Sequence, residues 1–286
     1  MASLFLVAKD VTVDSCNVST SYMTNAFPTS AVIGLIDAFR FWLDNSASKH
    51  GLDIGFTEEM HDSQKSKAFA IVKSFSTNLG KKAFPAFASQ GGSAHKSISP
   101  SELQLNETTA NIQASLVFEL KLTDELDSLE GVIEAFRLFL QQARFAGGKI
   151  TSSPVVEAFD SRGNLEEGLS KEKGWVLKQA YERFEELSGE LGIDQAMQEF
   201  SFTYIDKEAE GSARYYKKHK GWLFFNLQGY QFIGAPTEKD GSRNGHPHVF
   251  AEPVINLNEF VYFRAENTKE LFWYWEEHEN CIELTQ

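Results

Sequence analysis

The sequence predicts an α+β fold in which an antiparallel sheet packs against helices. Three observations support this class. Polar and apolar residues alternate over residues 112–122, apolar residues at helical spacing follow directly, and strand and helix patterns also alternate before this pair. With 286 residues, of which 42% are hydrophobic, the chain can bury one large core or two modest ones.

The first 77 residues predict a strand, a helix and a second strand. Residues 3–8 are apolar and form the first strand, which a Ser/Thr/Asn-rich passage follows. Thr29 or Ser30 can cap the helix. Its apolar face recurs at helical spacing and consists of Val32, Leu35, Ile36, Phe39 and Leu43. Residues 69–75 are apolar and extended in character, which predicts the second strand.

A third strand and a second helix are the clearest elements of the sequence. Residues 112–122 alternate so regularly that we predict one buried and one exposed face, the exposed residues being Gln113, Ser115, Glu119 and Lys121. Thr123 can cap the helix that follows, and Asp124 and Glu125 suit its positive end. Its apolar stripe is Leu126, Leu129, Ile133, Phe136 and Leu140. We expect this helix to end at Gly147-Gly148.

This order of elements is that of a ferredoxin-like or RNA-recognition-motif (RAMP-type) sheet. The long excursion between the second and third strands then forms a β-hairpin thumb at about residues 63–111. We place a soft boundary near Thr151, which separates a lobe of residues 1–150 from a less regular C-terminal lobe of residues 151–286.

The C-terminal lobe gives weaker patterns. Residues 171–187 predict a helix with Val176, Ala180, Phe184 and Leu187 on one face, and residues 200–205 predict a strand. Residues 221–234 predict a buried hairpin or strand pair, and residues 248–255 another strand. The aromatic-rich residues 258–278 predict a largely helical end.

One segment of the chain is basic although the chain as a whole is acidic. The formal net charge is −13, yet no Asp or Glu occurs between Asp62 and Glu102, a stretch that carries six lysines. A second window without acidic residues, residues 211–237, combines basic side chains with Tyr215, Tyr216 and Trp222. A solvated loop accounts for either window alone, whereas two such windows favour contact with a polyanion.

Nucleic-acid binding requires cations for phosphates and flat rings for unpaired bases. The thumb offers Lys73, Lys81 and Lys82 for phosphates, and Phe84 and Phe87 for stacking or wedging. The alternative is that these phenylalanines pin the thumb to the core. Further candidates are Arg144, Gly147, Gly148, Arg214, Lys217 and Lys218. The two glycines either bring backbone amides close to a phosphate or simply end a helix.

Enzyme and metal motifs are weak by comparison. G-x-S-x-G, Walker and H-E-x-x-H motifs do not occur. His246 and His248 flank a proline without the carboxylate or cysteine pattern of a metal site, so we predict no metal and no cofactor. A ribonuclease site that uses His50, His61, His95 or His219 stays open, because such sites assemble in space.

The compartment is predicted from the cysteines and the hydropathy pattern. Cys16 and Cys281 lie far apart and form no disulfide framework, which favours a reducing cytoplasm. No stretch approaches the roughly 18 apolar residues of a membrane span. We therefore expect a soluble protein with no membrane partner.

Several short stretches occur in an order that resembles a known family. They are Asn17–Ser21 followed by Phe27-Pro28, a helix with Gly34 and Ala38, Arg144–Gly148, Gly221–Tyr230, and Phe250–Pro253 before an aromatic-rich segment. Together they resemble the second Csy protein of type I-F CRISPR-Cas surveillance complexes, over nearly the whole chain. Ala26 and Asp37 depart from the glycine and histidine usual in that family.

The resemblance implies a non-catalytic RNA-binding subunit that holds the 5′ handle of the guide RNA (crRNA). It implies as partners a large Csy subunit and a filament of backbone Csy subunits in a Cascade-type ribonucleoprotein for antiviral defence, and leaves open contact with target DNA near the flanking motif. A prokaryotic cytoplasm fits, as does origin from a virus or mobile element. The alternatives are a guide-processing endoribonuclease of the same fold superfamily and a protein scaffold that touches no RNA.

Overall fold

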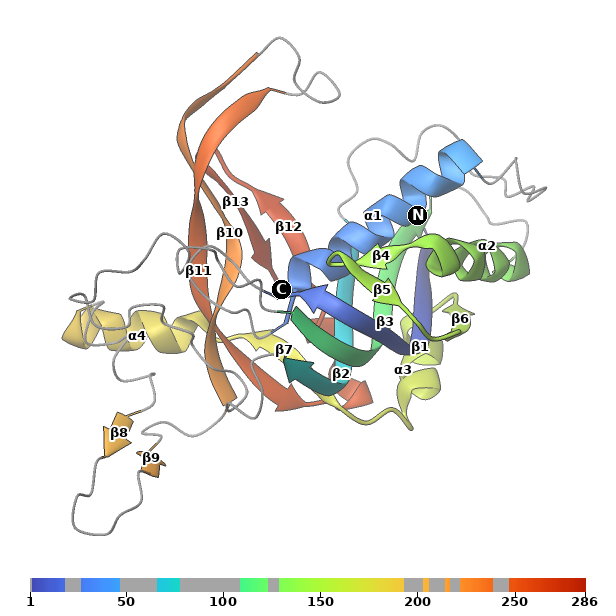
Figure 1. Cartoon of the computed structure of the whole chain (residues 1–286), viewed down its shortest axis with the longest axis horizontal. Helices are drawn as coiled ribbons and strands as arrows, with labels where there is room; N and C mark the ends of the chain where they lie inside the picture. The colour runs from blue at the N-terminus through green and yellow to red at the C-terminus, as the bar shows by residue number, and fades with distance from the viewer. Residues whose placement is uncertain are drawn as a thin grey trace.

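The computed structural model describes residues 2–18, 27–46, 66–77, 109–122, 129–192, 203–205, 214–216, 222–238 and 247–286. Within these residues the chain is an α+β protein whose strands pair almost entirely antiparallel. Eleven strands form one sheet, and β8 (Thr203–Ile205) and β9 (Arg214–Tyr216) form a separate pair. Figure 1 shows the helices packed around the sheet. No helix among the described residues is long and apolar enough to span a membrane.

The first half of the chain builds one end of the sheet. Its elements are β1 (Ala2–Asn17), α1 (Thr29–Ser46), β2 (Lys67–Thr77), β3 (Thr109–Leu122), α2 (Leu129–Gln142), β4 (Arg144–Phe145) and β5 (Gly148–Ile150). The strands lie side by side in the order β2-β3-β1-β5, and each neighbouring pair is antiparallel. The predicted order of strand, helix, strand, strand and helix is therefore confirmed, and the structure adds β4 and β5 after α2.

Both helices of this half cover the same face of the sheet. Phe39 of α1 meets Phe136 of α2 edge to face at 4.7 Å between ring centroids, and Phe118 of β3 meets Phe136 at 5.5 Å. The predicted apolar face of α1, from Val32 to Leu43, is buried as expected. In α2, Leu129 is exposed and the buried residues are Val132, Ala135, Phe136, Phe139 and Leu140.

The second half continues the same sheet. Its elements are β6 (Val155–Phe159), α3 (Arg162–Leu169), β7 (Trp175–Gln179), α4 (Tyr181–Leu191), β10 (Trp222–Thr237), β11 (His248–Tyr262), the 3-10 helix η4 (Ala265–Glu270), β12 (Tyr274–Glu277) and β13 (Cys281–Thr285). β7 connects the two halves, because it pairs with β11 over five residues and with β2 through Trp175 and Val72. The boundary near Thr151 stays a prediction.

The segment from Phe263 to Trp273 covers the sheet face opposite α1 and α2. Phe272 packs on Phe5 and Phe69 at 6.0 and 4.9 Å between ring centroids. The Trp273 backbone exchanges two hydrogen bonds with Ala68, and its Nε1 donates to the Leu177 carbonyl at 3.0 Å. The first three strands are therefore buried on both faces.

This cover corrects the prediction that β3 has an exposed face. Ser115 is fully buried and Glu119 is 7% exposed. Glu119 accepts a hydrogen bond from Ser3 Oγ at 3.0 Å and lies 3.7 Å from Arg162, while Ser115 donates to Glu172 at 2.8 Å. The alternation was real, but Ser115 and Glu119, which it placed outside, are buried with partners of their own.

Three other boundary predictions were wrong. The first strand runs on through the polar passage to Asn17, since β3 and β5 supply its backbone partners there. The helix α2 ends at Gln142, and Gly147 belongs to a hairpin turn. Residues 222–234 of the predicted pair lie in the single strand β10, whose partner is β11.

Two predicted helices in the second half were wrong over much of their length, since α4 confirms the first only from Tyr181 on and η4 is a short 3-10 helix within the second. Residues 171–187 hold strand β7 before helix α4, because Gly174 lies so close to β2 that a Cβ there would be 2.7 Å from the Val72 carbonyl oxygen. Residues 258–278 hold the end of β11, η4 and β12. Helix α3 was missed, although Ser161 caps it by accepting a hydrogen bond from the Asn164 N–H.

Candidate nucleic-acid interface

The hairpin β4–β5 contains three of the predicted RNA-contact residues, Arg144, Gly147 and Gly148. Ala146 and Gly147 form its two-residue turn with φ of 46° and 78°, the positive values that such tight hairpins require. Gly148 sits against β1, where a Cβ would be 2.7 Å from the Asp14 carbonyl oxygen. The fold therefore explains why glycine occupies both positions, and an RNA role for the two glycines stays a prediction.

Two cations stand opposite each other on this hairpin. Arg144 and Lys149 are paired in the antiparallel register, and both side chains are exposed. The Arg144 guanidinium donates to the Gly147 carbonyl at 3.2 Å and makes no ion pair among the described residues. Like charges placed directly across a β pair repel, but Asp14 of β1 faces Lys149 from its other side and offsets part of this repulsion, so an anion would bind chiefly beside Arg144. Sequence reasoning missed Lys149, which becomes visible only once residues 144–149 are recognised as a hairpin.

The N-terminus of α1 lies beside the same hairpin. The rings of Phe27, just before the helix, and Phe145 of β4 are 6.1 Å apart between centroids. The first turn of α1 carries no acidic residue, so the positive end of the helix dipole is not neutralised there. The positive end of a helix and two opposed cations thus meet in one region of the fold (Figure 1).

The Lys73 ammonium is held by two acidic side chains and is not free to contact a phosphate. Its ammonium lies 2.7 Å from carboxylate oxygens of both Asp10 and Glu172. Burial lowers the pKa of Lys73, but the hydrogen bonds and charges of these two acids outweigh that effect and raise it. The positive charge is therefore already compensated within the chain.

The other predicted contacts lie either outside the described residues or in the β8–β9 pair. Lys81, Lys82, Phe84, Phe87, Lys217 and Lys218 lie outside the described residues. Arg214 begins β9, where its backbone pairs with Ile205. The described structure thus brings together Arg144, Gly147 and Gly148 from the predicted set, and keeps Lys73 apart in its own ion cluster.

Reactive groups are few in the described part of the chain. Burial raises the pKa of the Cys16 thiol to about 12, which leaves it protonated and unreactive. His248 is exposed on β11 and packs against the Phe250 ring at 5.2 Å. His50, His61, His95, His219 and His246 lie outside the described residues. No group of three or more metal-ligating side chains occurs among the residues described.

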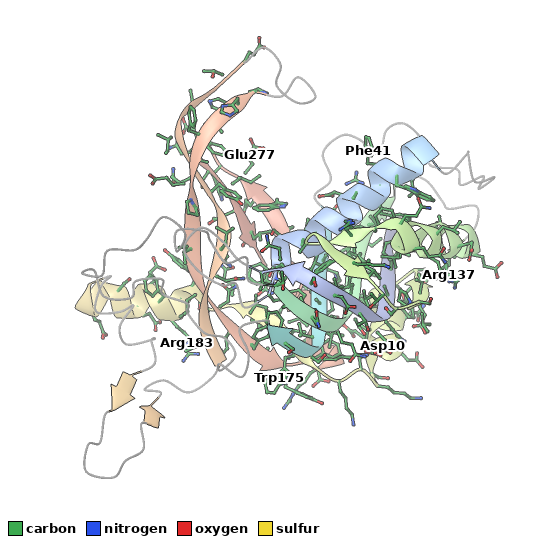
Figure 2. All side chains as sticks on the ribbon, viewed as in Figure 1. Asp10, Phe41, Arg137, Trp175, Arg183 and Glu277 are labelled. Atoms are coloured by element: carbon green, nitrogen blue, oxygen red, sulfur yellow. The ribbon has the colours of Figure 1, made fainter. Side chains whose placement is uncertain are left out.

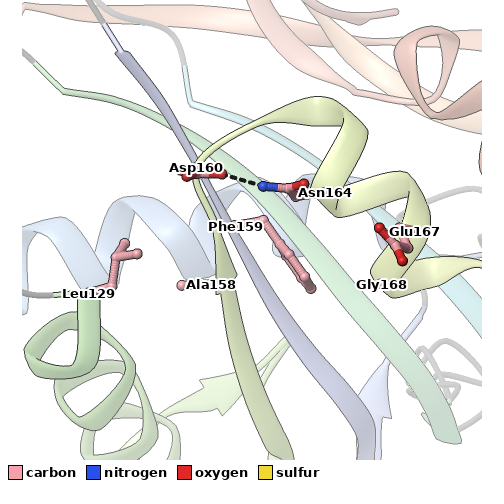
Figure 3. Close-up of a pocket in the computed structure, with 7 residues that line it drawn as sticks. All are labelled: Leu129, Ala158, Phe159, Asp160, Asn164, Glu167 and Gly168. Atoms are coloured by element: carbon pink, nitrogen blue, oxygen red, sulfur yellow. Dashed lines mark hydrogen bonds between the residues drawn. The ribbon is translucent and has the colours of Figure 1, made fainter.

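A hollow of about 450 Å³ lies between α2, β6 and α3 (Figure 3). Asp160 and Glu167 line it together with apolar atoms of Leu129 and Phe159, and Asn164 Nδ2 donates to Asp160 at 2.7 Å. Its two carboxylates would repel phosphate. The hollow therefore does not extend the nucleic-acid interface.

The family of the chain is established by comparison with family models. A model described as CRISPR-associated protein (Cas_Csy2) matches residues 6–282, which is nearly the whole chain. The chain belongs to the Cas_Csy2 family. A search of the curated proteins finds no match.

Membership in the Cas_Csy2 family confirms the resemblance found in the sequence and makes this chain a CRISPR-associated protein. The match spans both halves of the sheet, including β4–β5 and the β10–β11 pair. The two opposed cations of β4–β5 therefore belong to a Cas_Csy2 protein.

Proposed function

We propose that this chain is a non-catalytic subunit of a type I-F CRISPR surveillance complex that binds the 5′ handle of the guide RNA. It would work in a prokaryotic cytoplasm and dock the large and backbone Csy subunits. The observation that carries the proposal is the opposed pair Arg144 and Lys149, in a chain of the Cas_Csy2 family. Paired cations on a rigid hairpin suit a phosphate backbone, which binds without base-specific contacts.

The arrangement of the first five strands supports the proposal. The order β2-β3-β1-β5, with α1 and α2 on one face, fits a β-α-β-β-α-β sheet of the RNA-recognition-motif type. In such a sheet the connection between β2 and β3 is the thumb, which carries Lys81 and Lys82. RNA would then be held by the thumb and by the β4–β5 hairpin, and read largely by shape.

The RNA contact is tested by the salt dependence of handle binding. Each phosphate contact on a single strand contributes about 0.7 to the slope of log K against log salt. We expect Arg144→Ala with Lys149→Ala to weaken binding of handle RNA and to lower this slope by up to about 1.4. The matched control is Arg137→Ala on α2, because Arg137 is exposed but already paired with Glu134.

An unchanged slope in the double variant would remove β4–β5 from the RNA interface. Incubation of the same protein with repeat RNA tests the nuclease alternative. Metal-independent cleavage that is lost when one histidine is replaced would overturn the non-catalytic assignment.

The outer half of the β10–β11 pair is suited to docking a protein subunit. Figure 1 shows it rising away from the other described elements. Ile233 and Phe250 stand opposite each other there and are 55% and 72% exposed. Residues 230–238 and 247–254 contain Glu238 and Glu252 but no Lys or Arg. The exposed apolar pair fits a partly apolar protein surface better than it fits RNA.

Co-assembly measures this docking role. Ile233→Asp with Phe250→Asp should abolish co-purification with the other Csy subunits and leave handle-RNA affinity unchanged. Val155→Asp on β6 is the control, because Val155 is 59% exposed but lies far along the sheet from this pair. Normal assembly of the double variant would exclude the outer half as a docking surface.

A further inference from the structure

A second cross-strand arrangement of aromatic and basic residues lies at the outer end of β7. Trp175 of β7 and Tyr262 of β11 stand opposite each other and pack edge to face, with 5.8 Å between ring centroids. They are 43% and 51% exposed, so large areas of both rings face solvent. Figure 2 shows Trp175 at the lower edge of the molecule, away from α1.

The antiparallel register continues beyond this aromatic pair. The Phe263 N–H donates to the Gly174 carbonyl at 3.0 Å, which is the next step of the same ladder. Lys173 and Arg264 lie beyond the paired strands, and extending the register by one more step places them opposite each other, with the Arg264 backbone extended at φ −135° and ψ 126°. Because side chains alternate along a strand, these two cations lie on the same face as Trp175 and Tyr262.

The two cations are not neutralised by the chain. Lys173 and Arg264 are both exposed, and neither makes an ion pair among the described residues. Glu172, next to Lys173, is bound by Lys73 and Ser115, and Glu266, two residues after Arg264, forms no ion pair with it in the described part of the chain. An unpaired, like-charged couple directly across a β pair is destabilising on its own.

We propose that Lys173, Trp175, Tyr262 and Arg264 form a stacking platform for single-stranded nucleic acid, separate from β4–β5. The rings take unpaired bases on their exposed faces, and the two cations hold the phosphates that flank those bases. The charge argues for this ligand over a protein, since an anion between Lys173 and Arg264 relieves their repulsion. DNA and RNA share this chemistry, and the platform contains nothing that reads a base edge.

Binding of a labelled oligothymidylate of about 12 nucleotides to the full chain tests the platform. All variants carry Arg144→Ala and Lys149→Ala as a common background, so the readout at the platform does not depend on the proposed function of β4–β5. We expect Trp175→Ala with Tyr262→Ala to weaken oligomer binding by about 10- to 100-fold, because stacking is lost for one or two bases. Lys173→Ala with Arg264→Ala should lower the salt slope by about 1.4.

Matched controls separate the platform from general effects of exposed residues. Phe41→Ala removes an aromatic side chain on α1 that is 66% exposed and belongs to none of the proposed binding surfaces. Lys178→Ala removes a cation already paired with Glu270 at 3.0 Å. Both controls should bind the oligomer as the background variant does.

Binding of an oligouridylate of the same length shows whether the platform prefers single-stranded DNA or RNA. Either preference agrees with the proposal. Unchanged oligomer binding in the aromatic double variant would overturn the proposal. If that variant also failed to join the other Csy subunits, the surface would be a protein interface instead. Loss of handle-RNA binding in the β4–β5 variant, with oligomer binding intact, would support two independent sites.

Discussion

Gly147 and Gly148 are adjacent glycines that serve different purposes. Gly147 adopts φ +78°, but nothing lies within 4 Å of the position where a Cβ would project. Gly148 has an ordinary φ, yet its Cβ would be 2.7 Å from the Asp14 carbonyl oxygen and 2.8 Å from Cys16 backbone atoms. The first glycine is required by a dihedral angle and the second by the close approach of two strands.

This difference predicts unequal costs for two single substitutions. Gly148→Ala should lower the free energy of unfolding by about 3 kcal/mol, because backbone atoms must move to admit the methyl group. Gly147→Ala should cost only about 1 kcal/mol, from the strain of a left-handed residue. Urea unfolding of both variants checks the order, and equal costs would show that β1 and β5 separate easily.

Among the secondary structure elements, those of the first half were the most predictable from sequence. The face of α1 and the strand β3 have strong periodicity, and their partners lie nearby in the chain. β7 and the segment from Phe263 to Trp273 were predicted as helix because their apolar residues come from contacts on both sides of a sheet, which erases the period of two. Their true partners are distant along the chain: Asn258 lies 79 positions from Gln179 of β7, and Ala68 lies 205 positions from Trp273.

Prediction of the candidate sites from sequence is limited in the same way, because their residues come together only through the pairing of strands. Arg144 could be chosen from the sequence, but Lys149, Trp175 and Tyr262 could not, because only the register of a hairpin or a distant strand pair places them side by side. Conversely, Lys73 was a reasonable choice from charge alone. Its two acidic partners lie 63 and 99 positions away along the chain, beyond the reach of sequence patterns.

The two halves of the β10–β11 pair should differ in local stability. The inner half packs against α4 through Leu223 and Leu257, which are 4% and 0% exposed, whereas the outer half has mostly exposed residues. Amide hydrogen exchange of the isolated chain should therefore be faster at 231–237 and 248–254 than at 223–228 and 256–260. Binding of a docking subunit should slow the outer half, and uniform exchange along both strands would contradict this prediction.

At the scale of the whole molecule, the sheet makes the halves depend on each other. Phe263, Leu271, Phe272 and Trp273 are each less than 5% exposed and cover the face of β1, β2 and β3 that carries Phe5 and Phe69. The Gln286 side chain extends this dependence to the other end, as it accepts from the Gln179 N–H and donates to the Leu177 and Leu271 carbonyls.

We therefore expect residues 1–150 alone not to form a stable unit. Without the C-terminal cover, several hundred Å² of aromatic and aliphatic surface would face water, which favours aggregation. Circular dichroism and size exclusion of this fragment test the expectation, with the full chain as the control. A soluble fragment with a cooperative thermal transition would instead support a domain boundary near Thr151.

Phe272 covers Phe5 but is synthesised much later, so the nascent chain lacks this contact during most of translation. A ribosome that adds 5 to 20 residues per second needs on the order of 10 to 50 seconds to extend the chain from Phe5 to Phe272. During that interval the first strands of the nascent chain exist without half of their packing. The cell must shield this surface throughout translation, so the yield of active protein should depend on chaperone supply more than its final stability would suggest.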